Sequence, residues 1–306
     1  MDFDKFLDIL KLGRLIVHSS FLVFLLGNLF AVILGATFDV YRFIFGYSIV
    51  FTAVLAVSYS NNYFDTSTDK YSIQTAFSGG SKILVEHPEL LRLVKWIAIG
   101  LFGLSIILGF LFMVVFSYPI TFLLMVILSN FLGWGYTSPP IKLVYRGLGE
   151  LSTMIAAGFI IPGMGYFVAM GQIDASFVYI AIPFLMYGLA FSINFEIPDL
   201  NADIRVNKKT LIVRKGQSFG FILTGLLLFL ATLSFLVIAQ LKLISGVINF
   251  WLITLLSLVP LGFTIWSLMK NDTDQIFAIK LVTRNVSSMF FLIILINVYF
   301  FFLILS

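Results

Sequence analysis

The residues with the clearest capacity for chemistry form two acidic clusters, the first at residues 61–69 and the second at residues 194–203. On a helix, the oxygen-bearing side chains of the first cluster fall within an arc of about 100°; they are Asn61, Asn62, Asp65 and Asp69. The carboxylates of the second share a narrower arc, although Pro198 interrupts the regular helical ladder; they are Glu196, Asp199 and Asp203. Each cluster therefore predicts a helix face rich in oxygen ligands.

Oxygen ligands without sulfur or imidazole favour a hard cation. The chain has no Cys, and its two His residues, His18 and His87, are too far apart for a His-based zinc or haem site. Mg²⁺ is usually held by one or two carboxylates together with water and substrate phosphate. Two clusters would suit two Mg²⁺ ions on either side of a diphosphate. For one cluster alone, a simply solvated acidic helix end is an equally good interpretation.

The elements that must position these clusters are membrane-spanning helices. Apolar residues make up 60% of the 306 residues and charged residues 11%, with a mean hydropathy of +1.06, whereas a soluble domain is about one quarter charged. A span needs roughly 20 mostly apolar residues. The sequence thus predicts an all-α membrane protein with one domain over residues 1–306. Nine stretches qualify as spans: about 15–36, 43–64, 95–117, 119–136, 150–170, 176–197, 219–241, 249–269 and 284–305.

The distribution of Lys and Arg predicts the orientation of these spans, because cytoplasmic loops carry the excess of positive charge. With the N-terminus in the cytoplasm, 17 of the 19 Lys and Arg lie on the inner side, and only Arg42 and Lys242 lie outside. Nine spans then place Ser306 outside the plasma membrane and both acidic clusters on the inner side. The first span is expected to be an uncleaved signal anchor, because eight more spans follow it.

The two clusters resemble the N-D-x-x-D-x-x-x-D and D-x-x-x-D motifs of the UbiA superfamily of intramembrane prenyltransferases. Its members have nine helices, with these motifs at the inner ends of the second and sixth, and the resemblance covers essentially the whole chain. It implies a UbiA-like helical bundle with its active site at the cytoplasmic face. The implied catalytic residues are Asp65, Asp69, Asp199 and Asp203, and the implied metal ligands are Asn61, Asp65, Asp199 and Asp203.

Two positions depart from the family pattern. Asn62 stands where the family usually has Asp, and it is assigned to prenyl or acceptor binding; restoring Asp there is expected to leave activity the same or raise it. Leu15 stands where many relatives have Pro after the first-helix Arg. Arg14 resembles that Arg and is a candidate diphosphate contact, although an interface Arg that snorkels to the headgroups is an equal alternative.

Diphosphate binding needs cations beside the metal ions, and the inner loops supply them. Residues 207–211 resemble the family's G-K-x-T-L run with Asn207 in place of the Gly, and Lys209 is the preferred phosphate contact. Lys82 is also assigned to the diphosphate; it follows Gly79-Gly80, whose backbone N–H groups can approach an anion closely. The alternative is that these basic residues only set topology and contact anionic lipid.

Residues 136–150 resemble the family's segment from Tyr to Gly-Glu. Pro139-Pro140 is expected to end the preceding helix at Ser138. The chain beyond it would aim two cations, Lys142 and Arg146, back at the cavity as diphosphate contacts. Two further residues of this segment are assigned to the prenyl chain or acceptor, Tyr136 and Glu150, although an acid at position 150 also favours a helix N-terminus.

These features predict Mg²⁺-dependent transfer of a polyprenyl group from its diphosphate to a small aromatic acceptor in lipid-quinone biosynthesis. The S-G-G-S run at 78–81 and Y-R-G-L-G-E at 145–150 resemble the MenA-like branch, and residues 70–84 lack the R-T-x-x-R-P run of 4-hydroxybenzoate relatives. A dihydroxynaphthoate of the menaquinone pathway is therefore favoured over 4-hydroxybenzoate or a glycerol-phosphate prenyl ether. A secondary transporter is the rival class, disfavoured because the middles of the spans hold almost no ionisable groups. The sequence indicates the lipid bilayer as surroundings, and no nucleic-acid or protein partner.

Overall fold

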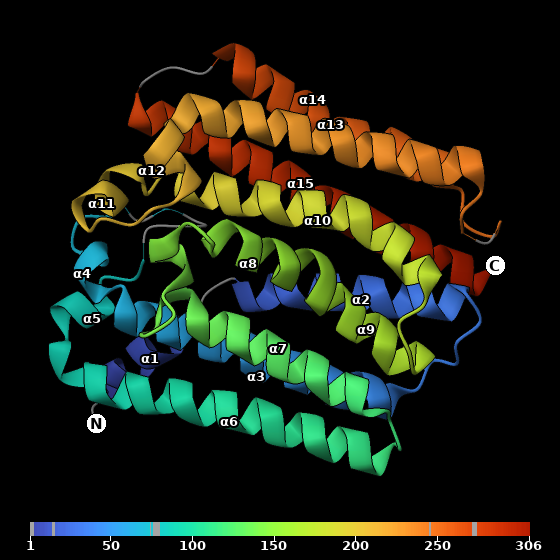
Figure 1. Cartoon of the computed structure of the whole chain (residues 1–306), viewed down its shortest axis with the longest axis horizontal. Helices are drawn as coiled ribbons and strands as arrows, with labels where there is room; N and C mark the ends of the chain where they lie inside the picture. Colours follow the sequence, from blue (N-terminus) through green and yellow to red (C-terminus); the bar gives the residue numbers. More distant parts are fainter. Residues whose placement is uncertain (1–2, 14–15, 74, 76–79, 245, 271–273) are drawn as a thin grey trace.

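The computed structural model describes residues 3–13, 16–73, 75, 80–244, 246–270 and 274–306, and all regular elements in these ranges are helices. Eight helical stretches are long and apolar enough to cross a membrane, and α2 adds a shorter apolar one. They run side by side along the molecule (Figure 1), which confirms the predicted all-α bundle. The spans are α2 (Ile16–Ile33), α3 (Val40–Phe64), α6 (Leu91–Val115), α7 (Ile120–Thr137), α8 (Gly149–Ile155) continuing through the π-turn η3 (Ala156–Ile160) into α9 (Ile161–Met170), α10 (Ala175–Glu196), α13 (Gln217–Leu241), α14 (Phe250–Lys270) and α15 (Gln275–Leu305).

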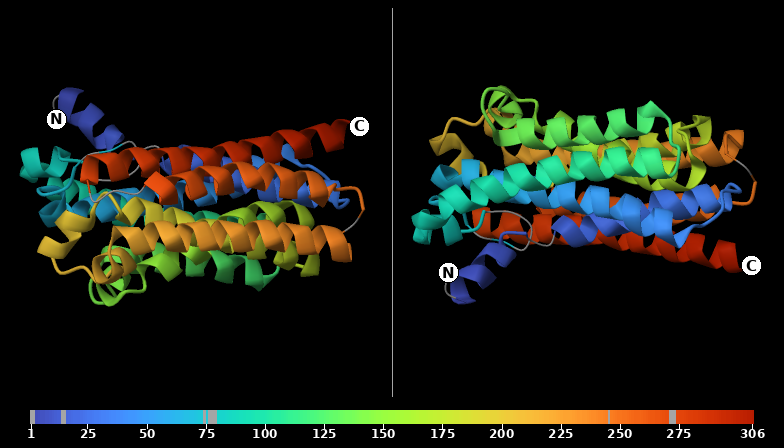
Figure 2. Two further views of the ribbon diagram at one scale, coloured as in Figure 1. Left: turned by 90° about the horizontal axis from the view of Figure 1, so that it is seen from above. Right: turned by 90° about the horizontal axis from the view of Figure 1, so that it is seen from below.

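Short helices gather at one end of the bundle, within the segments that the sequence predicted as inner loops. The N-terminus lies at this end and the C-terminus at the other (Figures 1 and 2). The short elements are α1 (Phe3–Lys11), α4 (Thr66–Asp69), α5 (Ile83–Glu86), α11 (Leu200–Arg205), α12 (Leu211–Lys215) and the 3₁₀ turns η1 (Pro88–Leu90) and η2 (Leu143–Arg146). The molecule therefore has one elaborated end, and the two termini lie at opposite ends as an odd number of spans requires.

Small residues allow α2 and α9 to pack with their backbones in close contact. A methyl group at Gly27 would overlap the Pro162 carbonyl, and one at Gly165 would overlap the Phe24 carbonyl. The Asn28 side-chain amide donates a hydrogen bond to the Gly165 carbonyl oxygen at 3.1 Å. Close approach through small residues and interhelical hydrogen bonds is the usual way that helices associate in lipid.

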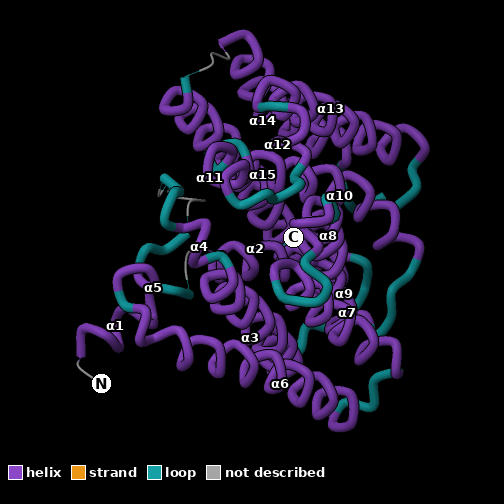
Figure 3. Tube along the Cα trace, turned by 60° about the vertical axis from the view of Figure 1, so that its left-hand side comes forward, coloured by secondary structure: helices purple, strands orange, loops and turns teal. Residues whose placement is uncertain are grey.

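The two acidic clusters meet at the elaborated end of the bundle. The first lies where α3 ends and α4 begins, and the second where α10 ends and α11 begins. Helix α4 contacts α11, and the two helices lie next to each other in Figure 3. Segments separated by 130 residues of sequence are thus brought together by the packing of the spans.

Candidate active site

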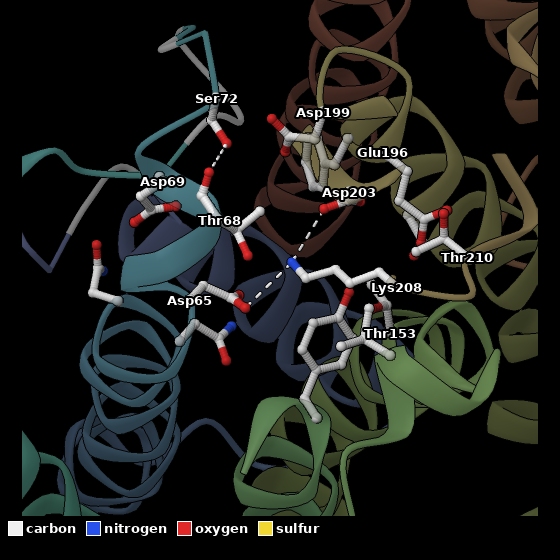
Figure 4. Close-up of a pocket in the computed structure, with 17 residues that line it drawn as sticks. Asp65, Thr68, Asp69, Ser72, Thr153, Glu196, Asp199, Asp203, Lys208 and Thr210 are labelled. Carbon is white, nitrogen blue, oxygen red and sulfur yellow. Dashed lines mark hydrogen bonds and ion pairs between the residues drawn. The ribbon is translucent and has the colours of Figure 1, made fainter. Parts of the chain in front are cut away.

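A polar cavity of about 180 Å³ lies among α3, α4, α7, α10 and α11 at the elaborated end (Figure 4). Both acidic clusters contribute to its wall, so the sequence-derived site residues of the two clusters are gathered around one space. The contributing side chains are Asn61, Asn62, Asp65, Asp69, Glu196, Asp199 and Asp203.

The first cluster is positioned by the break between α3 and α4. Asp65 is the last-turn cap of α3 and precedes α4, so its carboxylate stands at a change of direction rather than inside a straight helix. Asn61 is held one turn earlier, where its Oδ1 accepts a hydrogen bond from Thr137 Oγ1 at 2.9 Å. Gly80 packs against the buried Asp69 carboxylate with φ +58°, and a methyl group there would overlap it. Gly80 therefore serves close packing on Asp69; Ser78 and Gly79 lie outside the described residues.

The second cluster is followed by a Schellman turn that closes α11. Asn207 adopts a left-handed conformation with φ +57°, which Asn tolerates better than most residues. Its N–H donates to Ile204 O at 3.2 Å, and the Lys208 N–H donates to Asp203 O at 3.1 Å. These are the two hydrogen bonds of the Schellman motif, and they bring Lys208 back beside Asp203.

Lys208 links the two clusters across the cavity. Its Nζ lies 3.3 Å from Asp65 Oδ1 and 3.3 Å from Asp203 Oδ1, and the residue is only 9% exposed. Burial lowers the pKa of Lys208, but attraction to Asp65 and Asp203 outweighs it and raises the pKa above its ordinary value. Burial raises the pKa of Asp203, while Lys208 opposes that shift. The structure thus places a charged ammonium group between the two motifs.

The cations assigned from the sequence lie elsewhere. Lys209 and Lys82 are exposed and do not line the cavity, and Arg14 lies outside the described residues. The expectation that Lys142 and Arg146 point into the cavity is wrong. Helix α7 ends before Ser138 as predicted.

The reason is the conformation of the following turn. Lys142 adopts φ +46°, and η2 turns Val144 into the cavity wall. Lys142 and Arg146, two residues before and after Val144, therefore face outwards. Lys142 Nζ lies 5.2 Å from the centre of the Tyr145 ring, and the Arg146 guanidinium donates a hydrogen bond to Pro140 O at 3.0 Å.

Tyr136 and Glu150, assigned to the prenyl chain or acceptor, have different surroundings. Tyr136 lines the cavity. Glu150 is buried, and its carboxylate accepts a hydrogen bond from the Leu211 N–H at the start of α12. An acid at a helix N-terminus is electrostatically favourable. Glu150 therefore caps a helix, but it caps α12 rather than its own span, and it holds the loop that carries Lys208.

Sequence reasoning placed Glu196 in the second cluster but gave it no role. In the structure Glu196 lines the cavity and is 7% exposed. The hydroxyl-bearing side chains of Thr153, Ser192 and Thr210 line the cavity as well. The spacing of Glu196 from Asp199 and Asp203 was the available signal, and Thr210 is the Thr of the run that resembles G-K-x-T-L, whereas nothing in the sequence pointed to Thr153 or Ser192.

Asn62 uses its side-chain amide to hold the end of the α1 segment. Its Nδ2 donates to Ser58 O at 2.8 Å and to Leu12 O at 3.4 Å, and Ser58 Oγ donates to the same Leu12 oxygen at 2.7 Å. A carboxylate at this buried position has no hydrogen to donate, and it would oppose the two carbonyl oxygens. These contacts reverse the expectation that restoring Asp would be neutral or favourable.

We therefore expect Asn62→Asp to lower the free energy of unfolding by about 1–3 kcal/mol, the cost of leaving buried polar groups unpaired. Thermal unfolding in detergent, followed together with turnover, measures the effect. Asn62→Ala removes the amide without adding charge and separates the lost hydrogen bonds from repulsion. A melting temperature and turnover at or above those of the wild type in Asn62→Asp would show that the amide does not hold Leu12.

The chemistry of the cavity wall fits Mg²⁺. Its donors are carboxylate and amide oxygens, which hard cations prefer. In the part of the chain that the structure describes, no three His, Asp or Glu side chains converge as a ready-made metal site. That arrangement fits a Mg²⁺ ion held by one or two carboxylates and completed by water and phosphate better than a closed protein cage.

Comparison with known proteins agrees with this architecture. The model of the UbiA prenyltransferase family matches residues 20–294. The 1,4-dihydroxy-2-naphthoate octaprenyltransferase of Bacillus subtilis (strain 168) is 23% identical over 163 residues, which are 53% of this chain and 51% of that protein. The chain therefore matches about half the length of this relative.

Solved structures share the fold over nearly the whole chain. A UbiA homologue from Archaeoglobus fulgidus, bound to GPP and Mg²⁺, has a TM-score of 0.67 and 15% identity, covering 97% of this chain and 100% of that one. A structure of digeranylgeranylglyceryl phosphate synthase in membranes has a TM-score of 0.65 and 15% identity, covering 96% and 98%. At these identities the similarity shows a shared fold.

Proposed function

This chain belongs to the UbiA prenyltransferase family, and we propose that it transfers a polyprenyl group from a prenyl diphosphate to a small aromatic acceptor in a Mg²⁺-dependent reaction. The observation that carries this proposal is the single cavity lined by both acidic clusters and bridged by Lys208. It offers a charged site for a diphosphate at the end of an apolar bundle that can hold an isoprenoid chain. That combination suits a substrate with a diphosphate head group and a lipid tail.

The charge of the cavity wall supports two Mg²⁺ ions. Its described residues include five carboxyl groups and one ammonium group, Asp65, Asp69, Glu196, Asp199, Asp203 and Lys208, an excess of acidic groups that divalent cations would offset. Asn61 and Asp65 would hold one ion, and Asp199 and Asp203 the other. When bound, the ions supply positive charge that stabilises the departing diphosphate.

We propose that the isoprenoid chain lies along α10. Phe195 lines the polar cavity, and Phe191, one turn further into the bundle, lines an apolar cavity of about 40 Å³. Their rings stack with centroids 6.0 Å apart. The walls of the apolar cavity include Leu26 and Ile293 from α2 and α15. A polyprenyl tail placed here would remain in an apolar environment while its diphosphate reaches Lys208.

We propose a dihydroxynaphthoate of the menaquinone pathway as the acceptor. The named activity of the Bacillus subtilis relative supports this choice over the matched half of the chain, as does the Tyr145–Glu150 run. 4-Hydroxybenzoate and a glycerol-phosphate prenyl ether are the alternatives.

The test supplies the purified protein with labelled geranylgeranyl diphosphate and the three acceptors in competition, with Mg²⁺ or with EDTA. We expect Mg²⁺-dependent labelling of the naphthoate. Labelling of another acceptor alone would reject the naphthoate and leave prenyl transfer standing. If Mg²⁺-dependent diphosphate release failed altogether, the transporter class would be favoured.

We propose that the chain spans the plasma membrane with its elaborated end on the cytoplasmic side. The sequence assigns 17 of the 19 Lys and Arg to that side of the spans. Single cysteines introduced at the exposed residues Ser67 and Asn207 should react with a membrane-impermeant thiol reagent only after the membrane of whole cells is opened. A cysteine at Ser306 should react in intact cells. The native chain has no Cys and supplies the background. Labelling of positions 67 and 207 from opposite sides would contradict the proposed active site.

A further inference from the structure

Glu196 is a buried carboxyl group whose hydrogen-bonding neighbour is a second carboxyl group, that of Glu150. The residue is 7% exposed at the end of α10 and lines the polar cavity. No N–H or hydroxyl donor in the part of the chain that the structure describes reaches either of its carboxyl oxygens. Leaving such a group unpaired away from water is costly, so a ligand that brings a donor to this point would gain from it.

The neighbouring charged groups are committed to other contacts. The Lys208 ammonium group lies at 3.3 Å from both Asp65 and Asp203. The Glu150 carboxyl group lies within hydrogen-bonding reach of Glu196, so that charges on both would repel each other, and it also accepts the Leu211 N–H. The missing donor is therefore expected to come from a bound molecule.

Diphosphate oxygens accept hydrogen bonds and carry negative charge, so a charged Glu196 would repel them, whereas it would attract a hydroxyl group. Figure 4 draws Glu196, Thr210 and Thr153 on one side of Lys208, and Asp65 and Asp69 on the other. The cavity wall also includes Phe195 and the hydroxyl groups of Ser192 and Tyr136. A carboxylate, hydroxyl groups and aromatic rings match a hydroxylated ring compound.

We infer that Glu196 binds a hydroxyl group of the acceptor and takes its proton during transfer. This inference rests on the proposed prenyl transfer and names the residue that recognises and activates the acceptor. As the allylic C–O bond breaks, its electron pair leaves with the diphosphate, and an acceptor ring carbon forms the new C–C bond. The hydroxyl proton passes to Glu196, which makes the ring more electron-rich. The ring carbon then loses its proton to the departing diphosphate, and Glu196 returns the hydroxyl proton.

The test compares Glu196→Gln with the wild type on 1,4-dihydroxy-2-naphthoate and on its O-methyl ethers. Gln has nearly the same shape but cannot take the proton. We expect transfer to the hydroxyl acceptor to slow by roughly 10²–10⁴-fold, the usual contribution of a general base, with the affinity for geranylgeranyl diphosphate and Mg²⁺ changed less than about twofold. An ether that blocks the recognised hydroxyl should be a poor acceptor for the wild type, and Glu196→Gln should slow it no further.

Glu86→Gln is the matched control, because Glu86 is exposed on α5 and does not line the cavity. Glu196→Asp retains a carboxylate and should recover part of the lost rate; it replaces Glu196→Gln in the comparison if the latter aggregates in detergent. Equal losses on the hydroxyl acceptor and every ether, or undiminished transfer in Glu196→Gln, would overturn the inference. Failure of the wild type to prenylate any hydroxylated acceptor would instead overturn the proposed function.

Discussion

Alanine in place of Asp65 or Asp199 is expected to abolish prenyl transfer while the protein stays folded in detergent. The two carboxylates belong to opposite walls of the same cavity, and each would hold one of the two proposed Mg²⁺ ions. Loss of one electrostatic contact to a developing negative charge slows catalysis by roughly 10²–10³-fold, and loss of a metal ligand should exceed that. Product formation from labelled geranylgeranyl diphosphate at several Mg²⁺ concentrations measures the effect.

Asp8→Ala provides the control for both variants. Asp8 lies on α1, where it forms a surface ion pair with Lys11 at 2.8 Å, and such pairs contribute little to stability. Its turnover should equal that of the wild type. Full activity of Asp65→Ala or Asp199→Ala at saturating Mg²⁺ would refute the assignment of that residue as a ligand.

Lys208→Met should nearly eliminate activity, whereas Lys209→Met should have little effect. Lys208 forms ion pairs with Asp65 and Asp203 inside the cavity, and removing one partner of a buried ion pair costs about 3–5 kcal/mol. We therefore expect Lys208→Met to bind geranylgeranyl diphosphate much more weakly and to unfold at a lower temperature in EDTA. Added Mg²⁺ should restore part of the stability, because it replaces the lost positive charge.

Lys209→Met is a closely matched control, being the same substitution at the adjacent, exposed residue. Substrate titrations and melting curves of the two variants, recorded side by side, decide between the lysines. If Lys209→Met loses substrate affinity and Lys208→Met does not, the phosphate contact is the one assigned from the sequence. Equal, small effects in both would remove this loop from the binding site.

The spans could be predicted from the sequence because the requirement for them is local. A stretch of about 20 apolar residues has few alternatives to a membrane helix, and each predicted span has a counterpart in the structure. The first two and the sixth illustrate the accuracy: about 15–36, 43–64 and 176–197 correspond to α2 (Ile16–Ile33), α3 (Val40–Phe64) and α10 (Ala175–Glu196). The short helices were not predicted, since segments of four to nine residues carry too little periodicity.

The acidic part of the site was also accessible from the sequence, whereas the choice of cation was not. Helical spacing places carboxylates on one helix face whatever surrounds them. Which of two adjacent lysine side chains points into the cavity, in contrast, depends on the turn that precedes them. Here the left-handed Asn207 directs Lys208 to the cavity and leaves Lys209 exposed. The signal was present in the resemblance itself: if Asn207 takes the place of Gly in G-K-x-T-L, the lysine of that run is Lys208.

The contact between α2 and α9 imposes an order of events on the synthesis of the protein. Asn28 and its partner Gly165 are 137 residues apart, so a ribosome adding roughly 5–20 residues per second needs about 7–27 s to deliver the second after the first. During that interval the small-residue face of α2 has no helix to receive it and is covered by lipid or by the insertion machinery. A bulky residue at Gly27 or Gly165 would prevent the late docking step. Its consequence would be less protein reaching the mature membrane form, with normal activity in each molecule that does.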